Sequence, residues 1–505
     1  MSEGITKIAQ LHGAEIYRDG SPDPDGKCVL LWVQRAKRAT SNKAANFAVD
    51  VANALDLPII AVFSLVETYP GATLRAYHYL AESLSELPAS FAKRGIGWQL
   101  RIGPPGSAIP TAAAELGAAI IVTDQDTIPL GRTWREDVAR AISVPLFAVD
   151  TDTVVPTSYF PNPEHASHTI RPKLWKRIAA ADLLDAIPDP RPKRRWAGTI
   201  DPGPNPKTAI EAFPIDRSVG PSPTIRGTRT EGEERLRSFV DLHLPTYAEQ
   251  RNFPDRRCQS MMSSYLHFGV FGPVEIARAC IDARTPNGGF IAPRGHAVIM
   301  PEPAIEDASL QVFLDELITQ RELAINYALR WPNFDRWESV PEWGRASMTA
   351  HASDPKPFRY RDDQLERGET HDQLWNAAQR QMVFEGYMPN YLRMYWAKQL
   401  PYWMESPEAA FNLAVHMNDR FQLDGRDANG YSGIAWSLGG RHDRPFPPNK
   451  PILGLIRPMG LRGMRKKFDV DAYIKMIADM IGEPIPGSAE PGPPTPRVAQ
   501  PRLEL

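Results

Sequence analysis

The chain has 505 residues, 42% of them hydrophobic, and a formal net charge of -2 from 58 basic and 60 acidic residues. This length predicts more than one domain, and the charge balance excludes a chain that is basic throughout, so any nucleic-acid contact must come from a local patch. Three widely spaced cysteines, Cys28, Cys258 and Cys280, argue against a disulfide framework and a four-cysteine iron–sulfur cluster, and we predict no metal site. No apolar signal core or run of about 18 apolar residues is present, so we expect a cytoplasmic protein without a membrane partner.

Short apolar runs alternate with helical patterns over residues 1–150. The expected strands are 28–33, 58–63, 97–102, 118–122 and 144–149, and the expected helices are 42–55, 74–94, 108–116 and 132–141. This alternation predicts a doubly wound parallel sheet, and helices on both faces would explain strands that are apolar throughout. No GxGxxG motif follows the first strand, which disfavours a conventional dinucleotide site, and the loops 34–39 and 64–72 are the candidate ligand loops.

The alternation stops after residue 150. Prolines and glycines cluster between residues 188 and 227, which predicts a connector over 151–231. Residues 232–481 have helical periodicity with loops near 284–303 and 354–368, so we expect a second, all-α domain. The proline-rich residues 482–505 predict a disordered tail.

Three tryptophans lie close together in the helical half: Trp375, Trp396 and Trp403. Trp396 and Trp403 are seven residues apart on an expected helix over 390–403, which is about two helical turns, unless Pro401 ends that helix early. Such spacing usually indicates core packing. Indoles at this spacing are also able to relay an electron, and the spacing alone leaves both interpretations open.

Several longer blocks follow in order along the chain. They are LLWVQRAKRATSNKAANFAVDVANAL (30–55), SSYLHFG (263–269), DELITQREL (315–323), LWNAAQRQMVFEGYMPNYLRMYWAKQLPYW (374–403), LDGRDANGYSGIAW (423–436), RHDRPF (441–446) and IRPMGLRGMRKKFDVDAYI (456–474). Together they resemble the class II cyclobutane pyrimidine dimer photolyases of the photolyase/cryptochrome family. The resemblance implies a Rossmann-like α/β antenna domain and an all-α domain that holds FAD.

The resemblance also implies which residues contact FAD. The phosphate contacts would be Tyr247, Gln259, Ser260, Met261, Met262 and Ser263. Hydroxyls and backbone N–H groups at a helix start suit a pyrophosphate, although serine there is ordinarily a helix cap. The flavin contacts would be Asn390, Arg393, Asn418, Asp424 and Asp427, with Asp424 paired to Arg393 and Asn418 facing flavin N5.

The remaining implied residues serve the lesion, the DNA and the electron relay. Glu316 would contact the dimer bases, Met394 and Trp436 would form apolar walls, and Asn418 would act at the flavin. Trp396 would lie nearest the flavin, Trp375 next, and Trp403 towards the surface. The expected DNA contacts are Arg444 and Arg457 in an intruding segment, and Arg462, Arg465, Lys466 and Lys467 in a basic run that is otherwise a solvated helix face.

Two departures from the family pattern bear on the lesion pocket. The block PNYLRMYW carries Pro389 and Asn390 where the family commonly has HGYMRMYW, and Gln320 replaces a larger basic side chain. The leading hypothesis is a lyase, a deoxyribodipyrimidine photolyase that acts as a monomer on double-stranded DNA with pyrimidine dimers and uses reduced FAD and light. The alternatives are a cryptochrome-like blue-light photoreceptor and a non-enzymatic nucleic-acid-binding protein. The α/β domain holds either a deazaflavin antenna of the 8-HDF/F0 type or no chromophore.

Overall fold

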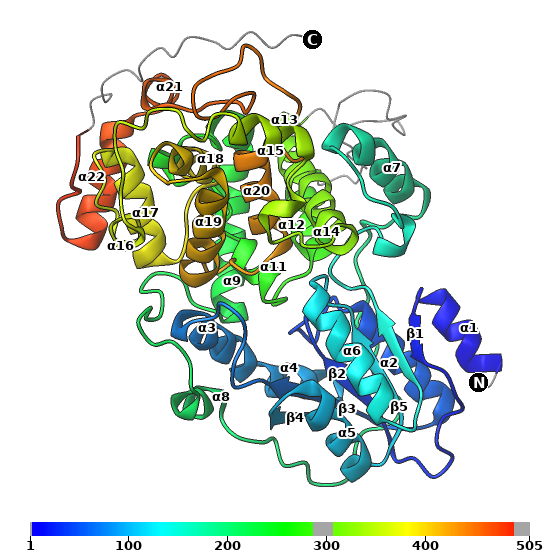
Figure 1. Ribbon diagram of the computed structural model, residues 1–505. Helices are drawn as coiled ribbons and strands as arrows, with labels where there is room; N and C mark the ends of the chain where they lie inside the picture. Colours follow the sequence, from blue (N-terminus) through cyan, green and yellow to red (C-terminus); the bar gives the residue numbers. More distant parts are fainter. Residues whose placement is uncertain (1–2, 286–306, 489–505) are drawn as a thin grey trace.

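The structure is a computed structural model that describes residues 3–285 and 307–488. An α/β domain built from the N-terminal part of the chain supports a helical domain, which lies above it in Figure 1. This confirms the predicted order of a doubly wound α/β domain and an all-α domain. In the two described ranges, no helix combines the length and the apolar character that a membrane crossing requires. The loop expected near 284–303 lies almost entirely outside the described residues.

A six-stranded sheet forms the centre of the α/β domain, with the strand order β1-β6-β5-β2-β3-β4. The strands are β1 (Glu15–Arg18), β2 (Cys28–Val33), β3 (Ile59–Leu65), β4 (Gly97–Ile102), β5 (Ala118–Asp124) and β6 (Leu146–Val149). Strands β2 to β6 are parallel, as predicted, and the short edge strand β1, which was not predicted, pairs antiparallel with β6. Every residue of β2, β3, β5 and β6 is buried, because helices cover both faces of the sheet.

Successive residues of β2 point into two different cores, as the pleat of a strand requires. Val29 and Leu31 face α1 (Glu3–Leu11), α2 (Lys43–Leu55), α3 (Leu74–Ser85) and α4 (Leu87–Arg94). Leu30 and Trp32 face α5 (Pro105–Leu116) and α6 (Pro129–Ala141). The single helix predicted over 74–94 is wrong: it divides at Glu86, two residues before Pro88, because proline lacks the N–H that a helix interior needs.

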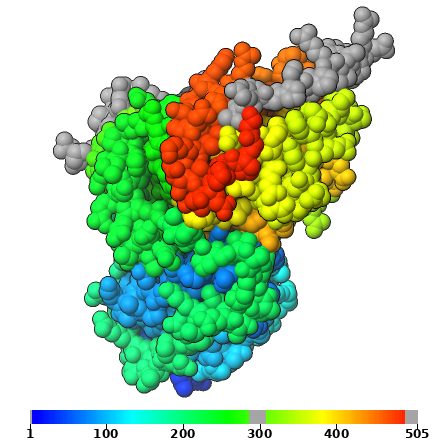
Figure 2. Space-filling model, turned by 90° about the vertical axis from the view of Figure 1, so that its left-hand side faces the viewer, coloured from blue at the N-terminus to red at the C-terminus, as the bar shows by residue number. Residues whose placement is uncertain are grey.

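The predicted connector is more ordered than its composition indicates. It contains α7 (Ser167–Ala180), which packs Trp175 into the helical domain with an indole hydrogen bond of 3.0 Å to Thr319 Oγ1, and the short α8 (Pro206–Ala209). Its later part follows the surface of the α/β domain, where the backbone N–H of Leu100 donates to the carbonyl of Pro202 at 2.8 Å. In Figure 2 this green segment covers the blue domain. The connector therefore ties the two domains together.

The helical domain has two apolar cores, one mainly around α17 to α20 and one around α9 to α13. Its helices are α9 (Arg229–Ser238), α10 (Tyr247–Gln250), α11 (Ser263–His267), α12 (Pro273–Arg284), α13 (Ala308–Leu314), α14 (Arg321–Arg330), α15 (Glu342–Thr349), α16 (Asp362–Glu366), α17 (Gln373–Glu385), α18 (Asn390–Gln399), α19 (Pro407–Phe421), α20 (Ala428–Gly439), α21 (Leu461–Arg465) and α22 (Val470–Ile481).

The prediction of a disordered tail from residue 482 is wrong for its first residues. Ser488 accepts a hydrogen bond from the backbone N–H of Gln373 at 3.1 Å and donates its own N–H to His371 at 2.8 Å. Residues 482–488 are therefore attached to the start of α17. Residues 489–505 lie outside the described part of the chain.

A π-helical turn at Asp315–Gln320 joins α13 and α14 into one continuous helix. Such turns insert one residue into the helical register and are frequent at functional sites. Here the turn contains Glu316 and Gln320, two of the residues singled out above.

Gly269 holds the turn after α11 against the first ligand loop of the α/β domain. Its φ of +70° lies in the left-handed region, and a Cβ atom there would collide with the carbonyl oxygen of Arg35. We expect Gly269→Ala to lower the free energy of unfolding by about 3 kcal/mol, from backbone strain together with overpacking. Gly13→Ala is the control, because Gly13 has a φ of +61° but no neighbour within 4 Å, and should cost only about 1 kcal/mol. Urea denaturation of both variants checks this; equal losses would contradict the steric explanation.

Candidate functional site

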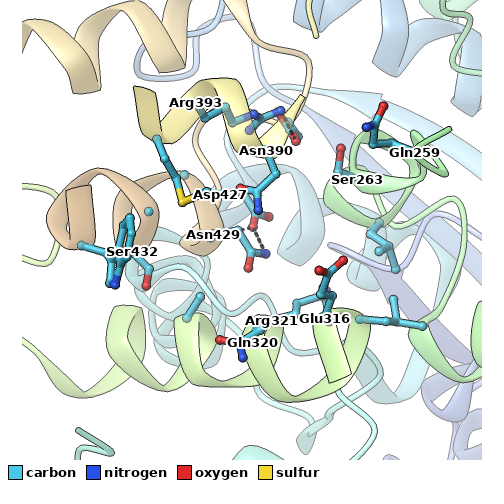
Figure 3. A pocket seen from close by; sticks show the side chains of 18 of the residues that line it. Gln259, Ser263, Glu316, Gln320, Arg321, Asn390, Arg393, Asp427, Asn429 and Ser432 are labelled. Atoms are coloured by element: carbon cyan, nitrogen blue, oxygen red, sulfur yellow. Dashed lines mark hydrogen bonds and ion pairs between the residues drawn. The ribbon is translucent and has the colours of Figure 1, made fainter. Parts of the chain in front are cut away.

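A cavity of about 830 Å³ opens into the helical domain. This is near the upper end of the range of about 300–1,000 Å³ that is usual for cofactor and ligand sites. Figure 3 shows Glu316 and Gln320 on one helix and Asn390 and Arg393 on another, facing each other across the space. The cavity is thus large enough for an extended cofactor together with a second ligand group.

The side chains predicted as cofactor and lesion contacts converge on this cavity although they are spread over nearly 200 positions. They are Tyr247, Gln259, Ser260, Met261, Met262, Ser263, Glu316, Gln320, Asn390, Arg393, Met394, Asn418, Asp424, Asp427 and Trp436. The family resemblance therefore selected residues that share one space in the fold.

Arg393 and Asp424 form an ion pair at the cavity wall, as predicted. Arg393 Nη2 donates to both carboxylate oxygens of Asp424, at 3.0 and 2.9 Å, and its Nε donates to the carbonyl of Met388 at 2.8 Å. The two side chains are 22% and 11% exposed. A charge held at this depth needs its partner, so the pair is a fixed polar feature of the site.

Asp427 connects the cavity to the α/β domain. Its side chain caps α20 by accepting from the backbone N–H of Asn429 at 3.1 Å, and it also accepts from Arg35 Nη2 at 2.7 Å and lies 3.0 Å from His267 Nδ1. Burial opposes its ionisation, but Arg35 and His267 hold the pKa of Asp427 well below its usual range. Asp427 is therefore an anion that orients one wall of the cavity.

Asn418 lies inside α19 with its amide orientation fixed by neighbours. Its Nδ2 donates to Asp419 Oδ1 at 2.9 Å, and its Oδ1 receives a long bond of 3.5 Å from Gln422 Nε2. Gln422, which sequence reasoning missed, also lines the cavity, is 2% exposed, and has an Oε1 atom without a hydrogen-bond partner among the described residues. A buried amide oxygen of this kind requires a donor, so the polar edge of a bound cofactor fits here.

Glu316 is held in place by two donors. The hydroxyl of Tyr247 donates to Oε2 at 2.5 Å and Arg251 Nε to Oε1 at 3.1 Å. Burial raises the pKa of Glu316, and the contacts with Tyr247 and Arg251 act in the opposite direction. The sequence placed Tyr247 at the cofactor phosphates; in the structure its hydroxyl bonds the predicted lesion contact, and Arg251 was not predicted at all.

Gln320 is exposed at the mouth of the cavity and donates through Nε2 to Asp315 Oδ2 at 3.3 Å. Asp315 also accepts two hydrogen bonds from Arg171 of the connector helix α7, at 2.8 and 2.9 Å. Arg171 lines the cavity as well. Arg171 thus places a basic side chain near Gln320, the position at which the family commonly has a basic residue. Arg171 belongs to a segment that was predicted to be only a connector.

The three tryptophans form a contiguous row that begins at the cavity. Trp396 lines the cavity and stacks on Trp375 with 6.3 Å between ring centroids and 8° between planes, and Trp375 meets Trp403 edge-on at 5.1 Å. Of the two outcomes left open for residues 390–403, the structure shows the early end: α18 ends at Gln399, and Pro401 lies in a short 3-10 turn. Trp403 was expected towards the surface; its side chain is buried, with 3% exposure, although it borders a second cavity of about 710 Å³.

The predicted DNA contacts lie outside the cavity. They are all exposed, on the segment 440–460 and on α21 and its end: Arg444, Arg457, Arg462, Arg465, Lys466 and Lys467. Arg465 is already paired with Asp471 at 2.9 and 3.0 Å. Arg457 lies over the ring of Phe446, 5.0 Å from its centroid, and Phe446 is 37% exposed.

A smaller pocket of about 120 Å³ lies where the two domains meet. The two candidate ligand loops of the α/β domain line it through Arg35, Lys37 and Tyr69, and Trp134 closes one side. This confirms that these loops, which follow β2 and β3, border a pocket at the carboxyl ends of parallel strands. His267 lines both this pocket and the main cavity.

Comparisons with known proteins agree on one family. The DNA photolyase family matches residues 29–193. A deoxyribodipyrimidine photo-lyase of Methanothermobacter thermautotrophicus is 31% identical over 94% of this chain and 99% of its own length, and one of Potorous tridactylus is 32% identical over 92% and 84%. A class III photolyase of Agrobacterium tumefaciens shares the fold with a TM-score of 0.64 at 18% identity, covering 91% of this chain and 88% of that one. A Synechocystis cryptochrome has a TM-score of 0.63 at 17% identity, covering 90% and 89%.

Proposed function

This chain belongs to the photolyase/cryptochrome family, and from that premise we propose that it is a class II deoxyribodipyrimidine photolyase that repairs cyclobutane pyrimidine dimers in DNA. The observation that carries the proposal is the arrangement of the main cavity. Arg393 and Asp424 form one wall, Glu316 lies across the space from Arg393, and Met394 and Trp436 also line the cavity. We further propose that the protein acts as a cytoplasmic monomer.

FAD is the proposed cofactor of the main cavity, and when bound it supplies light absorption and one-electron chemistry. Ser263 is the first residue of α11, where backbone N–H groups suit a pyrophosphate, and Gln259 lines the cavity four residues before it. Arg393 presents a cation that favours a negatively charged reduced cofactor, and Asp424 keeps that cation in place. Gln422 Oε1 is the acceptor for a donor on the cofactor.

Glu316 is the proposed contact for the flipped dimer. Because Tyr247 and Arg251 fix the carboxylate, it enters the complex already oriented. As a carboxylate it accepts from a base N–H group, and as a carboxylic acid it donates to a base carbonyl. Met394 and Trp436 supply the apolar surface against which the dimer bases pack.

The exposed cations around segment 440–460 are the proposed DNA surface. Lys450 and Arg457 lie over the exposed ring of Phe446, 5.9 and 5.0 Å from its centroid, and the exposed Arg444 is two residues before it in the chain, so an apolar group lies among positive charges. Cations of this kind neutralise phosphates, so the measured affinity for duplex DNA should fall as the salt concentration rises. Flipping a dimer out of the duplex costs less free energy than flipping an intact base pair.

A light-dependent repair assay tests the proposed function. Reduced protein is mixed with duplex oligonucleotides that carry either a cyclobutane dimer or a (6-4) photoproduct, and is illuminated with blue light. We expect restoration of the cyclobutane substrate and none in the dark. A protein that holds reduced FAD and restores neither substrate would overturn the repair proposal and favour a photoreceptor.

Replacing Glu316 tests the lesion contact separately from the cofactor. We expect Glu316→Ala to lower the repair yield per absorbed photon about threefold to tenfold, because one charge-assisted hydrogen bond to the dimer is lost. The variant should still bind FAD. The matched control is Glu342→Ala at the start of the remote helix α15. Unchanged repair yield in Glu316→Ala would show that this carboxylate does not serve the dimer.

Replacing Trp396 tests the proposed relay. Phenylalanine retains the packing but is a much poorer electron donor. We therefore expect Trp396→Phe to slow light-driven reduction of oxidised FAD at least about tenfold. A barrier increase of about 1.4 kcal/mol is enough for this change in rate. Absorbance of the oxidised flavin under blue light measures the rate. Trp98→Phe, buried in the α/β domain, is the control and should behave as wild type. Equal rates in the two variants would contradict the relay.

The pocket between the domains is the proposed place for a deazaflavin antenna. Its volume of about 120 Å³ is below the usual lower limit of about 300 Å³ for a ligand site, so a three-ring chromophore does not fit without movement of Tyr69 or Trp134. An absorbance band in addition to that of FAD in the purified protein would show that the pocket opens. FAD absorbance alone would show that it holds no antenna.

A further inference from the structure

Two tryptophans line the main cavity, and their surroundings differ in charge. The indole N–H of Trp396 donates to Gln379 Oε1 at 2.8 Å. The face of Trp436, in contrast, lies against the ammonium group of Lys398, whose Nζ is 4.6 Å from the ring centroid. Donation to an amide oxygen makes an indole richer in electrons, whereas an ammonium group over the ring attracts its π electrons. The first indole is therefore easier to oxidise than the second.

Lys398 is a buried lysine that the mechanism proposed above does not use. It is 1% exposed, lies on α18 two residues after Trp396, and donates through Nζ to the backbone carbonyl of Ser437 on α20 at 2.9 Å. In the described residues this is the one hydrogen bond of Nζ, which otherwise lies over the ring of Trp436, and the charges that act on it are those of Asp443 and Arg457. A buried charge with so little compensation is costly, so its position against Trp436 needs an explanation.

The two tryptophans also differ in what lies behind them. Trp396 leads to Trp375 and Trp403, so an electron that it loses is replaced along the row. Trp436 has no aromatic ring packed against it among the described residues. An electron taken from Trp436 would have no replacement, and the charge separation would be lost by return of that electron.

We propose that Lys398 directs light-driven electron transfer to Trp396 by making Trp436 a poor donor. The inference rests on the proposed function, because it requires flavin in the main cavity. With flavin bound in the main cavity, Trp396 would give up one electron to it on illumination, Trp375 would refill Trp396, and Trp403 would refill Trp375. The missing electron would then be on Trp403, which borders the second cavity, until an external one-electron reductant replaces it. No bond breaks and no proton moves in these steps. Lys398 acts through Trp436 and is a positioning residue.

The fluorescence lifetime of bound oxidised flavin tests this proposal, because electron transfer from a neighbouring indole shortens it. We expect Trp396→Phe to lengthen the lifetime. Adding Lys398→Met, which removes the charge and keeps the side-chain length, should shorten the lifetime again, by about tenfold if the ammonium stabilises the ring electrons as strongly as desolvated cation–π pairs do. Adding Trp436→Phe to that double variant should restore the long lifetime.

Two results would overturn the proposal while flavin remains bound. One is an equal lifetime in Trp396→Phe with and without Lys398→Met. The other is a short lifetime that persists after Trp436→Phe, since the quenching group would then be another residue. Absence of flavin from the wild-type protein, or failure of wild-type repair, would instead contradict the proposed function, so the two failures are distinguishable.

A pH series repeats the test without replacing Lys398. Burial lowers the pKa of Lys398 to about 7. Two charged residues of the segment after α20 also act on this pKa: Asp443 raises it and Arg457 lowers it. In Trp396→Phe the ammonium is present below that pH and protects Trp436, and it is lost above it. We therefore expect the flavin lifetime to shorten between pH 6 and 8.5 in Trp396→Phe but not in Trp396→Phe/Trp436→Phe. A lifetime that does not change with pH in either variant contradicts the proposal.

Discussion

Arg35→Met should lower the free energy of unfolding by about 3–5 kcal/mol, the usual cost of removing one partner from a buried ion cluster. Arg35 is 5% exposed and lies 2.7 Å from Asp427, 3.3 Å from Asp152 and 3.4 Å from Asp126. Methionine fills a similar volume but removes the cation that these three carboxylates share, which leaves Arg321, 2.8 Å from Asp152, as the remaining arginine of the cluster. Because Asp427 caps α20, the same change should also loosen one wall of the main cavity.

The backbone around Arg35 explains why it reaches these acids. Asp124, at the end of β5, accepts the backbone N–H groups of Gln34, Arg35 and Ala36 at 2.8, 2.5 and 2.7 Å. This fixes the loop after β2 so that the guanidinium extends into the helical domain. The expected loss therefore reflects the ion cluster and not a change in the loop.

Urea denaturation across a pH series measures the effect of Arg35. Arg132→Met is the control, because Arg132 and Glu136 are 60% and 47% exposed and such a pair contributes about 0–1 kcal/mol. The pKa of Asp427 is depressed in the folded state, so its contribution is complete above the unfolded value of about 3.9 and is lost as the pH falls through the folded value. The difference between wild type and Arg35→Met should therefore be largest near neutral pH and decrease in acid. A loss no greater than that of Arg132→Met would contradict a structural role of this cluster.

The fold was predictable from sequence where burial imposes a simple pattern. Strand β2 matches its expected bounds, because a strand covered on both faces reads as an uninterrupted apolar run. The edge strand β4 also matches its expected bounds, although Gln99 and Arg101 interrupt its apolar residues. The short edge strand β1 and helix α7 were missed, since neither carries such a run, and Trp175 of α7 is buried only through packing on another domain. The composition of residues 151–231 predicted a connector between the domains, whereas in the structure this segment packs against both of them.

The candidate site was predictable as a set of positions but not as a set of contacts. The sequence blocks brought Arg393 and Asp424 together correctly. They gave no indication of Arg251 or Arg171, because each acts through a partner that only tertiary packing supplies, as when Arg171 reaches Asp315 across 144 positions. They also missed Gln422, whose place in the cavity lining follows from the packing of α19. Helical periodicity likewise does not reveal a π turn, so the orientation of Glu316 required the structure.

Arg393→Met should weaken FAD binding by about a hundredfold or more, which corresponds to about 3 kcal/mol. The variant removes the cation expected to favour the negatively charged reduced cofactor and leaves the Asp424 carboxylate, which is 11% exposed, unpaired at the cavity wall. Both changes oppose a bound anion. The flavin-to-protein absorbance ratio after dialysis, followed by titration of the stripped protein with FAD, measures the loss.

Two further variants separate the charge of Arg393 from its geometry. Arg393→Lys keeps a cation but cannot retain both the Nε bond to Met388 and the Nη2 bonds to Asp424, so we expect binding between that of wild type and Arg393→Met. Arg361→Met removes an arginine that likewise donates to both oxygens of a carboxylate, that of Asp363, but the two side chains are 70% and 49% exposed and lie outside the cavity. It should retain wild-type affinity. If Arg393→Met also retained wild-type affinity, the Arg393–Asp424 pair would not be part of the cofactor site.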